Sequence, residues 1–147
     1  MGKIKPTISI TSNASTATTD PGPLSVALSL SATDTLDVTA VQSKIILPTA
    51  ADDQVLWDEA AFTDGTETAG TDGGYVWVKN LDATYNIFIG HKASTAALEG
   101  AGAADRLMTL KPGEFAWFPW DFTADIIVDA SGTTTKGVES WVFTRTQ

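Results

Sequence analysis

The chain has 147 residues, no cysteine, and 18 acidic against 9 basic residues, which gives a formal net charge of −9 at pH 7. This length predicts one main domain with a core large enough to need no disulfide. The acidic balance argues against nucleic acid as a partner, since such binding rests mainly on lysine and arginine. No apolar run approaches the 18 residues of a membrane span, so no membrane partner is expected.

The first 23 residues divide into a short apolar part and a polar part that ends in a Pro-Gly-Pro break. Ile4 and Ile8 flank Pro6, and the alternation around Ile8 predicts a short edge strand. From Thr11 onwards almost no side chain is able to anchor a core, so the segment cannot offset its ordering entropy alone. We therefore predict an N-terminal arm over residues 1–23 that pairs with another protein or subunit. A frayed terminus or a first strand of the sheet is the alternative.

From residue 24 the apolar pattern changes abruptly. Leucine and valine alternate with serine and alanine over residues 24–31, which predicts a half-buried strand. A second apolar run covers residues 36–47, and its period shifts between Ala40 and Val41, as a β-bulge would cause. We place residues 24–147 in a single β-domain.

Two aromatic residues, Trp57 and Phe62, lie next to or inside the polar stretch over residues 58–74. Trp57 ends a short apolar segment, and Phe62 lies inside the acidic, glycine-rich stretch over residues 58–74. Long loops in compact domains are usually functional or mobile. Phe62 is therefore a candidate contact anchor.

Residues 106–122 are predicted to form a hairpin that supplies much of the core or of an interface. Pro112 and Gly113 suit the second and third positions of a type II turn. Five aromatic residues follow within eight positions: Phe115, Trp117, Phe118, Trp120 and Phe122. Pro119 removes a ladder donor, which predicts an edge strand or a bend.

The rings of this hairpin point to both faces of its sheet, because Trp117 has the phase opposite to Phe118 and Trp120. One face should be core, and the other needs a cover, since a bare patch of that size is an aggregation risk. A second sheet, the arm, another subunit or a glycan are the candidate covers. A core or subunit contact is the leading interpretation.

Further short strands are predicted over residues 75–79, 85–89, 126–128 and 138–145. The resulting eight to ten strands, with turn signals at intervals of about 8–12 residues and no convincing helix, predict an all-β fold. An antiparallel β-sandwich or jelly roll is the expected architecture. If Trp141 of the last strand lies in the core, Trp141→Ala is expected to lower stability by about 3–5 kcal/mol.

Residues suited to catalysis or to metal binding are scarce. The single histidine, His91, stands beside Lys92 and is interpreted as a loop or surface residue. The acidic clusters lack the spacing of a calcium loop. Nothing marks the remaining glutamates as a glycosidase pair. We expect no enzymatic activity and no cofactor.

Residues 75–145 resemble small virion structural proteins of tailed bacteriophages, especially those of marine and cyanobacterial phages. The likeness rests on four short patterns. They are YVWVKNL at 75–81, NIFIG at 86–90, LKPGE at 110–114 and ESWVF at 139–143.

Several proteins of this kind are capsid decoration, or cement, proteins. The resemblance implies a jelly roll on the outer capsid surface, commonly a homotrimer, that bridges neighbouring major capsid protein subunits. The expected contact residues are those of the arm and selected rings, namely Ile4, Pro6, Ile8, Trp57, Phe62 and Trp120. The alternative is a glycan-binding or host-attachment module of the virion, with Trp57, Trp77 or Trp120 as the stacking platform.

Overall fold

The computed structural model describes residues 2–11, 25–29, 36–38, 40–48, 53–62, 73–91, 98, 105–132 and 136–145. The chain forms two compact units, Met1–Val38 and Thr39–Gln147. Each unit is described by itself below.

The N-terminal unit contains two antiparallel strand pairs. Strand β1 (Gly2–Ile4) pairs with β4 (Leu36–Val38), and β2 (Thr7–Thr11) pairs with β3 (Ser25–Ser29). The polar part of the predicted arm, residues 12–23, lies outside the described residues.

The boundary between the units lies later than the sequence predicted. The strand expected over 24–31 exists as β3, but it pairs with β2 and belongs to the N-terminal unit. The run over 36–47 is not one bulged strand, since it divides into β4 and β5 (Ala40–Ile46), which belong to different units. An alternating pattern specifies a half-buried strand without specifying its partner, and this explains both differences.

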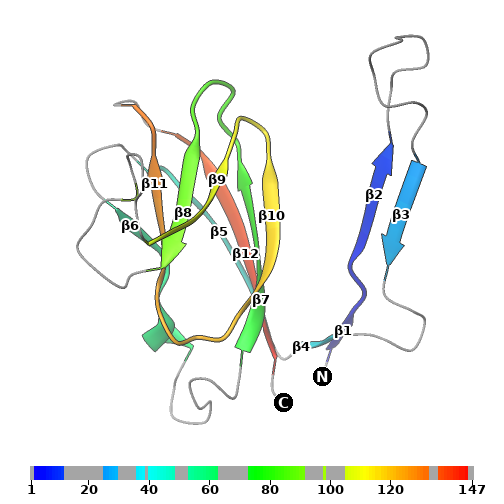
Figure 1. Cartoon of the computed structure of the whole chain (residues 1–147). Coiled ribbons are helices and arrows are strands. Elements are labelled where there is room, and N and C mark those ends of the chain that lie inside the picture. Colours follow the sequence, from blue (N-terminus) through cyan, green and yellow to red (C-terminus); the bar gives the residue numbers. More distant parts are fainter. Residues whose placement is uncertain are drawn as a thin grey trace. The chain divides into compact units, whose positions relative to one another are not determined.

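The second unit is a sandwich of two four-stranded sheets (Figure 1). One sheet has the order β10-β7-β12-β5 and the other has the order β6-β11-β8-β9. Besides β5, the strands are β6 (Gln54–Trp57), β7 (Gly73–Asn80), β8 (Ile87–His91), β9 (Arg106–Leu110), β10 (Phe115–Trp120), β11 (Ile126–Ala130) and β12 (Val138–Arg145). The antiparallel β-sandwich predicted from the sequence is confirmed.

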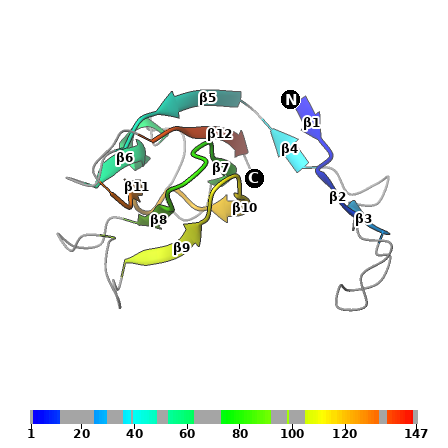
Figure 2. The ribbon, with the colours of Figure 1, turned by 90° about the horizontal axis from the view of Figure 1, so that it is seen from above.

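The strands of the sandwich pair in a nested order along the chain, from the innermost pair to the outermost. Strand β8 pairs with β9, β7 with β10, β6 with β11, and β5 with β12. This is the pairing of one long hairpin whose tip is β8 and β9. The additional pairs β12 with β7 and β11 with β8 join its arms into two sheets, which face each other in Figure 2.

The core lies between the two sheets, and alternation along the strands fills it. On β7, Val76 and Val78 are fully buried, whereas Tyr75 and Trp77 are half-buried on the opposite side. On β12, Val138 and Val142 point inward in the same way. Among the described residues this core cluster has fifteen buried members, which come from both sheets and from Phe62 and Phe122 beside them.

The turn before β10 has the predicted type II geometry. Gly113 has φ +77°, and the Glu114 N–H donates to the Lys111 carbonyl oxygen at 3.0 Å. The Lys111 N–H in turn donates to the Glu114 carboxylate at 2.8 Å. Strand β10 lies at an edge of its sheet, as Pro119 predicted.

Gly113→Ala is expected to lower the free energy of unfolding by about 1 kcal/mol, because the new Cβ is forced into positive φ. Apart from the two neighbouring residues, no described atom lies within 4 Å of that Cβ position, so the expected loss comes from backbone conformation. Urea denaturation of both proteins measures it. An unchanged midpoint would contradict the assigned backbone conformation.

Candidate functional site

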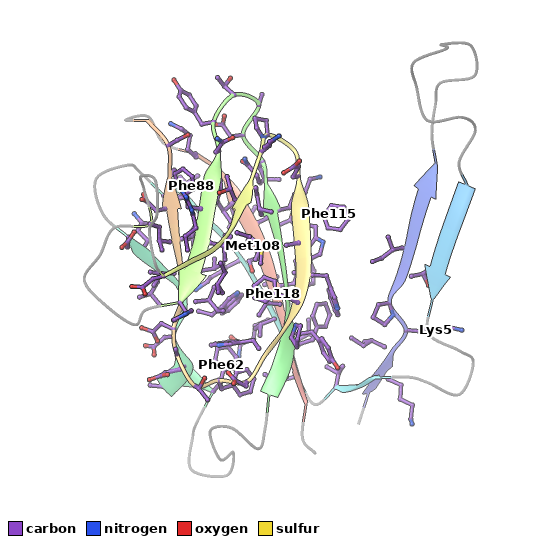
Figure 3. All side chains as sticks on the ribbon, viewed as in Figure 1. Lys5, Phe62, Phe88, Met108, Phe115 and Phe118 are labelled. Atoms are coloured by element: carbon purple, nitrogen blue, oxygen red, sulfur yellow. The ribbon has the colours of Figure 1, made fainter. Side chains whose placement is uncertain are left out.

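The outer side of the sheet β10-β7-β12-β5 carries a continuous group of rings and branched aliphatic side chains. They alternate with the core residues of the same strands, so they point away from the other sheet. Figure 3 shows Phe115 on the outer side of β10. We term this surface the aromatic face, and its members are Val41, Ile45, Tyr75, Trp77, Phe115, Trp117, Trp141 and Phe143.

Strand register places three tryptophans in one row across the aromatic face. Trp117 of β10 lies opposite Trp77 of β7, which lies opposite Trp141 of β12. Ser43 of β5 completes the row. Facing residues on neighbouring antiparallel strands are about 4.5–5.5 Å apart at Cα, so the row is continuous.

Several rings of the face pack on one another. The Trp117 ring centroid lies 5.6 Å from that of Tyr75, with nearly parallel planes, and 5.2 Å from that of Phe143. Trp77 packs on Phe115 at 6.5 Å. These contacts hold the ring layer in place without another molecule.

Four side chains of the face remain widely exposed. The exposed fractions are 64% for Ile45, 53% for Phe115, 47% for Val41 and 38% for Trp141. Ile45 and Val41 lie on edge strand β5 and Phe115 on edge strand β10, whereas Trp141 lies on inner strand β12. An apolar area of this extent on one sheet face marks a contact surface.

The charges described on the face are balanced. Lys79 lies opposite Glu139 in the pairing of β7 with β12. The Glu139 carboxylate also accepts a hydrogen bond from the Trp141 indole N–H at 3.1 Å. The described part of the face is therefore near neutral in a chain of net charge −9.

Part of the outer side of the other sheet is covered by described side chains. Phe88 and Ile127 are buried there under Leu98. The Arg106 guanidinium lies over the Phe88 ring, 5.1 Å from its centroid. The two sheets thus differ in that only one of them leaves large apolar side chains grouped in the open on its described outer side.

Three of the predicted contact residues lie in the core, which corrects the sequence interpretation. Trp57, Phe62 and Trp120 are at most 6% exposed. The Phe62 ring packs on both tryptophans and stacks on Phe122, with centroids 5.2–5.9 Å apart. It lies at the lower end of the sandwich in Figure 3, where it closes the core.

The polar atoms of these tryptophans are bonded inside the protein as well. Trp57 Nε1 donates to Ser140 Oγ, and Trp120 Nε1 donates to the Ala124 carbonyl oxygen, each at 2.9 Å. Neither ring is accessible to a partner or a sugar. Of the three tryptophans considered for a glycan platform, only Trp77 lies on the outer face.

The residues predicted to mediate arm contacts lie in the N-terminal unit. Ile4 and Pro6 are half-buried, and Ile8 is exposed. Their part in partner binding stays a prediction.

Sequence reasoning placed Trp117 on the face opposite to Phe118 and Trp120 without deciding which face is outer, and it considered Trp77 as a stacking platform, but it did not foresee the aromatic face as a whole. Trp141 was considered as a core residue, and its exposure shows that it lies outside. Alternation along the sequence places Trp141 and Phe143 on one side of β12 and Val142 on the other, and likewise separates Tyr75 and Trp77 from Val76 on β7. Which of the two sides is buried is decided by the packing of the valines in the core.

The described side chains with a shifted pKa, namely Asp82, Asp121 and Lys44, owe the shift to local hydrogen bonds or to burial. His91 is half-buried at the end of β8, where its backbone N–H donates to the Asp105 carbonyl oxygen at 3.3 Å. Hydrogen bonds from the Tyr85 and Thr84 N–H groups lower the pKa of Asp82. A lowered pKa is the opposite of what a general acid needs.

The pKa values of Asp121 and Lys44 are also shifted by their immediate surroundings. The hydrogen bond from the Thr123 hydroxyl lowers the pKa of Asp121. Burial lowers the pKa of Lys44, and nearby Asp58 opposes that shift. Among the described residues no three histidine, aspartate or glutamate side chains gather as a metal site.

Comparisons with known proteins found no matching family, no similar curated protein and no similar solved structure. Within the described ranges no helix has the length and apolar character needed to cross a membrane.

Proposed function

We propose that this protein is a non-enzymatic capsid decoration protein that docks on the outer surface of a virion and bridges major capsid protein subunits. The observation that carries the proposal is the aromatic face, whose described part is near neutral and presents four widely exposed apolar side chains in a chain of net charge −9. Protein interfaces are enriched in such aromatic side chains at their centres and surrounded by polar residues.

The details of the face favour a protein partner over a sugar. Its most exposed members include Ile45 and Val41, which have no ring to stack on a sugar. The Trp117 ring is already engaged by two neighbours, and the Trp141 indole N–H is already bonded to Glu139. A glycan platform needs free ring faces and free hydrogen-bonding groups, whereas a packed protein surface needs neither.

The strand order supports assigning the sandwich to the jelly-roll class. A long hairpin rolled into two four-stranded sheets has eight strands and two Greek keys, as jelly rolls of viral capsid domains do. A fold by itself does not imply a function. The virion assignment rests on the phage-protein resemblance of residues 75–145, and the fold is compatible with it.

The size of the face favours many weak contacts over one strong contact. The four strands lie about 4.8 Å apart and are paired together over about six residues, at about 3.4 Å per residue. The face therefore spans about 400 Å². Specific stable interfaces bury about 800 Å² per partner. A capsid presents the same site many times, and linked or repeated contacts raise the overall affinity without any new interaction.

Trp141→Ala is expected to weaken binding to purified decoration-free shells at least about tenfold, as for a central aromatic interface residue. Co-sedimentation with shells at a series of protein concentrations measures the binding. Leu107→Ala is the matched control, since Leu107 is 54% exposed on the other sheet, and its binding should equal that of wild type.

Equal binding by both variants would remove the aromatic face from the proposal. Shells without the protein should also rupture at lower temperature than decorated shells. Equal durability would refute the cement role. If host polysaccharide quenched the tryptophan fluorescence of wild type and not of Trp141→Ala, the glycan-binding alternative would replace it.

A further inference from the structure

Strand β5 is a seven-residue sheet edge, and among the described residues no strand pairs with it on the side away from β12. It pairs with β12 in unbroken register over its seven residues and lies last in the sheet order. Residues 40–43 are exposed whichever side of the sheet they face, and Val41 and Ile45 are among the most exposed apolar residues of the sandwich. A strand of this kind offers its unpaired backbone groups to another strand.

The other three edge strands of the sandwich, β10, β6 and β9, have features that discourage pairing with a further strand. Strand β10 contains Pro119, which has no N–H to donate. Strand β6 has only four residues and a register shift against β11, and β9 has a register shift against β8. Within the described residues β5 has no proline and no such irregularity.

Lys44, the only charged residue of β5, does not protect the edge from pairing either. Lysine on an edge strand usually repels a further strand. Here the Lys44 ammonium lies over the Trp57 ring, 4.2 Å from its centroid, on the core side of the sheet. The positive charge of Lys44 therefore lies on the core side of the sheet and not at its open edge. Strand β5 contains no acidic residue, although the whole chain has a net charge of −9.

The sequence of β5 is complementary to itself when two copies run antiparallel around Ser43. Val41 then faces Ile45 of the second copy, Ser43 faces Ser43, and Gln42 faces Lys44. Branched apolar pairs and polar pairs directly opposite each other stabilise antiparallel strands. Because the same patch is used on both copies, the contact closes after two chains.

We infer that β5 of one copy pairs antiparallel with β5 of a second copy about a two-fold axis at Ser43. The pairing joins the two outer sheets into one eight-stranded sheet with both aromatic faces on the same side. The combined flat area is about 800 Å², the usual area per partner of a specific interface. This two-fold contact differs from the three-fold assembly that the phage resemblance implies, and it does not depend on the virion proposal.

Cysteine cross-linking tests the register, since the natural chain has no cysteine. Facing Cα atoms are about 4.5–5.5 Å apart, within the range of about 4.4–6.8 Å that a disulfide spans. Under mild oxidation Ser43→Cys should form a disulfide-linked dimer at least about tenfold faster than Val41→Cys. The two copies of Val41 would be offset by four residues, about 14 Å along the strands.

A mixture of Val41→Cys and Ile45→Cys chains should again cross-link quickly, because these positions face each other between copies. Equal cross-linking rates for Ser43→Cys, Val41→Cys and the mixture would overturn the inference. So would a trimer in solution whose Ser43→Cys form does not cross-link faster than Val41→Cys.

Two charge variants of the Ser43→Cys protein, substituted at the same two positions, give a second test of the pairing. Val41→Lys with Ile45→Lys sets like charges opposite each other, and the cross-linking rate should fall about tenfold or more. Val41→Lys with Ile45→Glu sets opposite charges there, and the rate should stay near that of Ser43→Cys. Both positions are exposed, and circular dichroism checks that the fold is kept. Equal rates for the two charge variants would overturn the inference.

Discussion

Replacing Trp120 with alanine is expected to lower the free energy of unfolding by about 4 kcal/mol, within the range for truncating a large buried ring. Trp120 is 6% exposed and packs edge-on against Phe62 and Phe122, with centroids 5.4 and 4.7 Å away. Its indole N–H also donates to the Ala124 carbonyl oxygen, which would lose that partner. The truncation therefore removes packing and a hydrogen bond together.

Trp141→Ala is the matched control, because it makes the same chemical change on the outer face. Its effect on unfolding should be about 1 kcal/mol or less, as for surface substitutions. Urea denaturation followed by circular dichroism measures both variants. Equal losses at the two positions would contradict the assignment of Trp120 to the core and of Trp141 to the aromatic face.

Gly90→Ala is expected to lower the free energy of unfolding by about 3 kcal/mol, at the upper end for overpacking. A Cβ on Gly90 would lie 2.5 Å from Leu98 Cδ2 and closer still to the Asp105 carbonyl oxygen. That oxygen accepts the hydrogen bond from the His91 N–H. Relief of the clash would displace Leu98, which packs with Phe88, or the Asp105 backbone.

Gly113→Ala separates this steric effect from a general effect of losing glycine. Gly113 has open space around its Cβ position, so its smaller loss comes from backbone conformation alone. The same urea titration compares the two variants. A loss at Gly90 no larger than that at Gly113 would show that the cover over Phe88 yields without strain.

The positions of Trp57, Phe62 and Trp120 show the limit of reading a contact site from a sequence. Trp57 and Phe62 stand in or beside polar stretches of the sequence. Trp57 nevertheless ends a core strand, and the short 3-10 helix after it (Glu59–Ala61) brings the Phe62 ring onto the core. Trp120 continues inward on the same strand whose alternate residues form the aromatic face. Polar neighbours along the chain do not report which surfaces a ring meets across the fold.

The amino-acid sequence alone determined that this chain folds into an antiparallel β-sandwich, with a type II turn at Pro112 and Gly113 and an edge strand at Pro119. These features follow from local chemistry, namely alternation, fixed φ and a missing N–H. Only the tertiary structure decided that β3 pairs with β2, and that Trp141 joins Trp77 and Trp117 in one outer row. Strand pairing and the choice of the buried face depend on contacts between residues far apart in the chain, which no local pattern specifies.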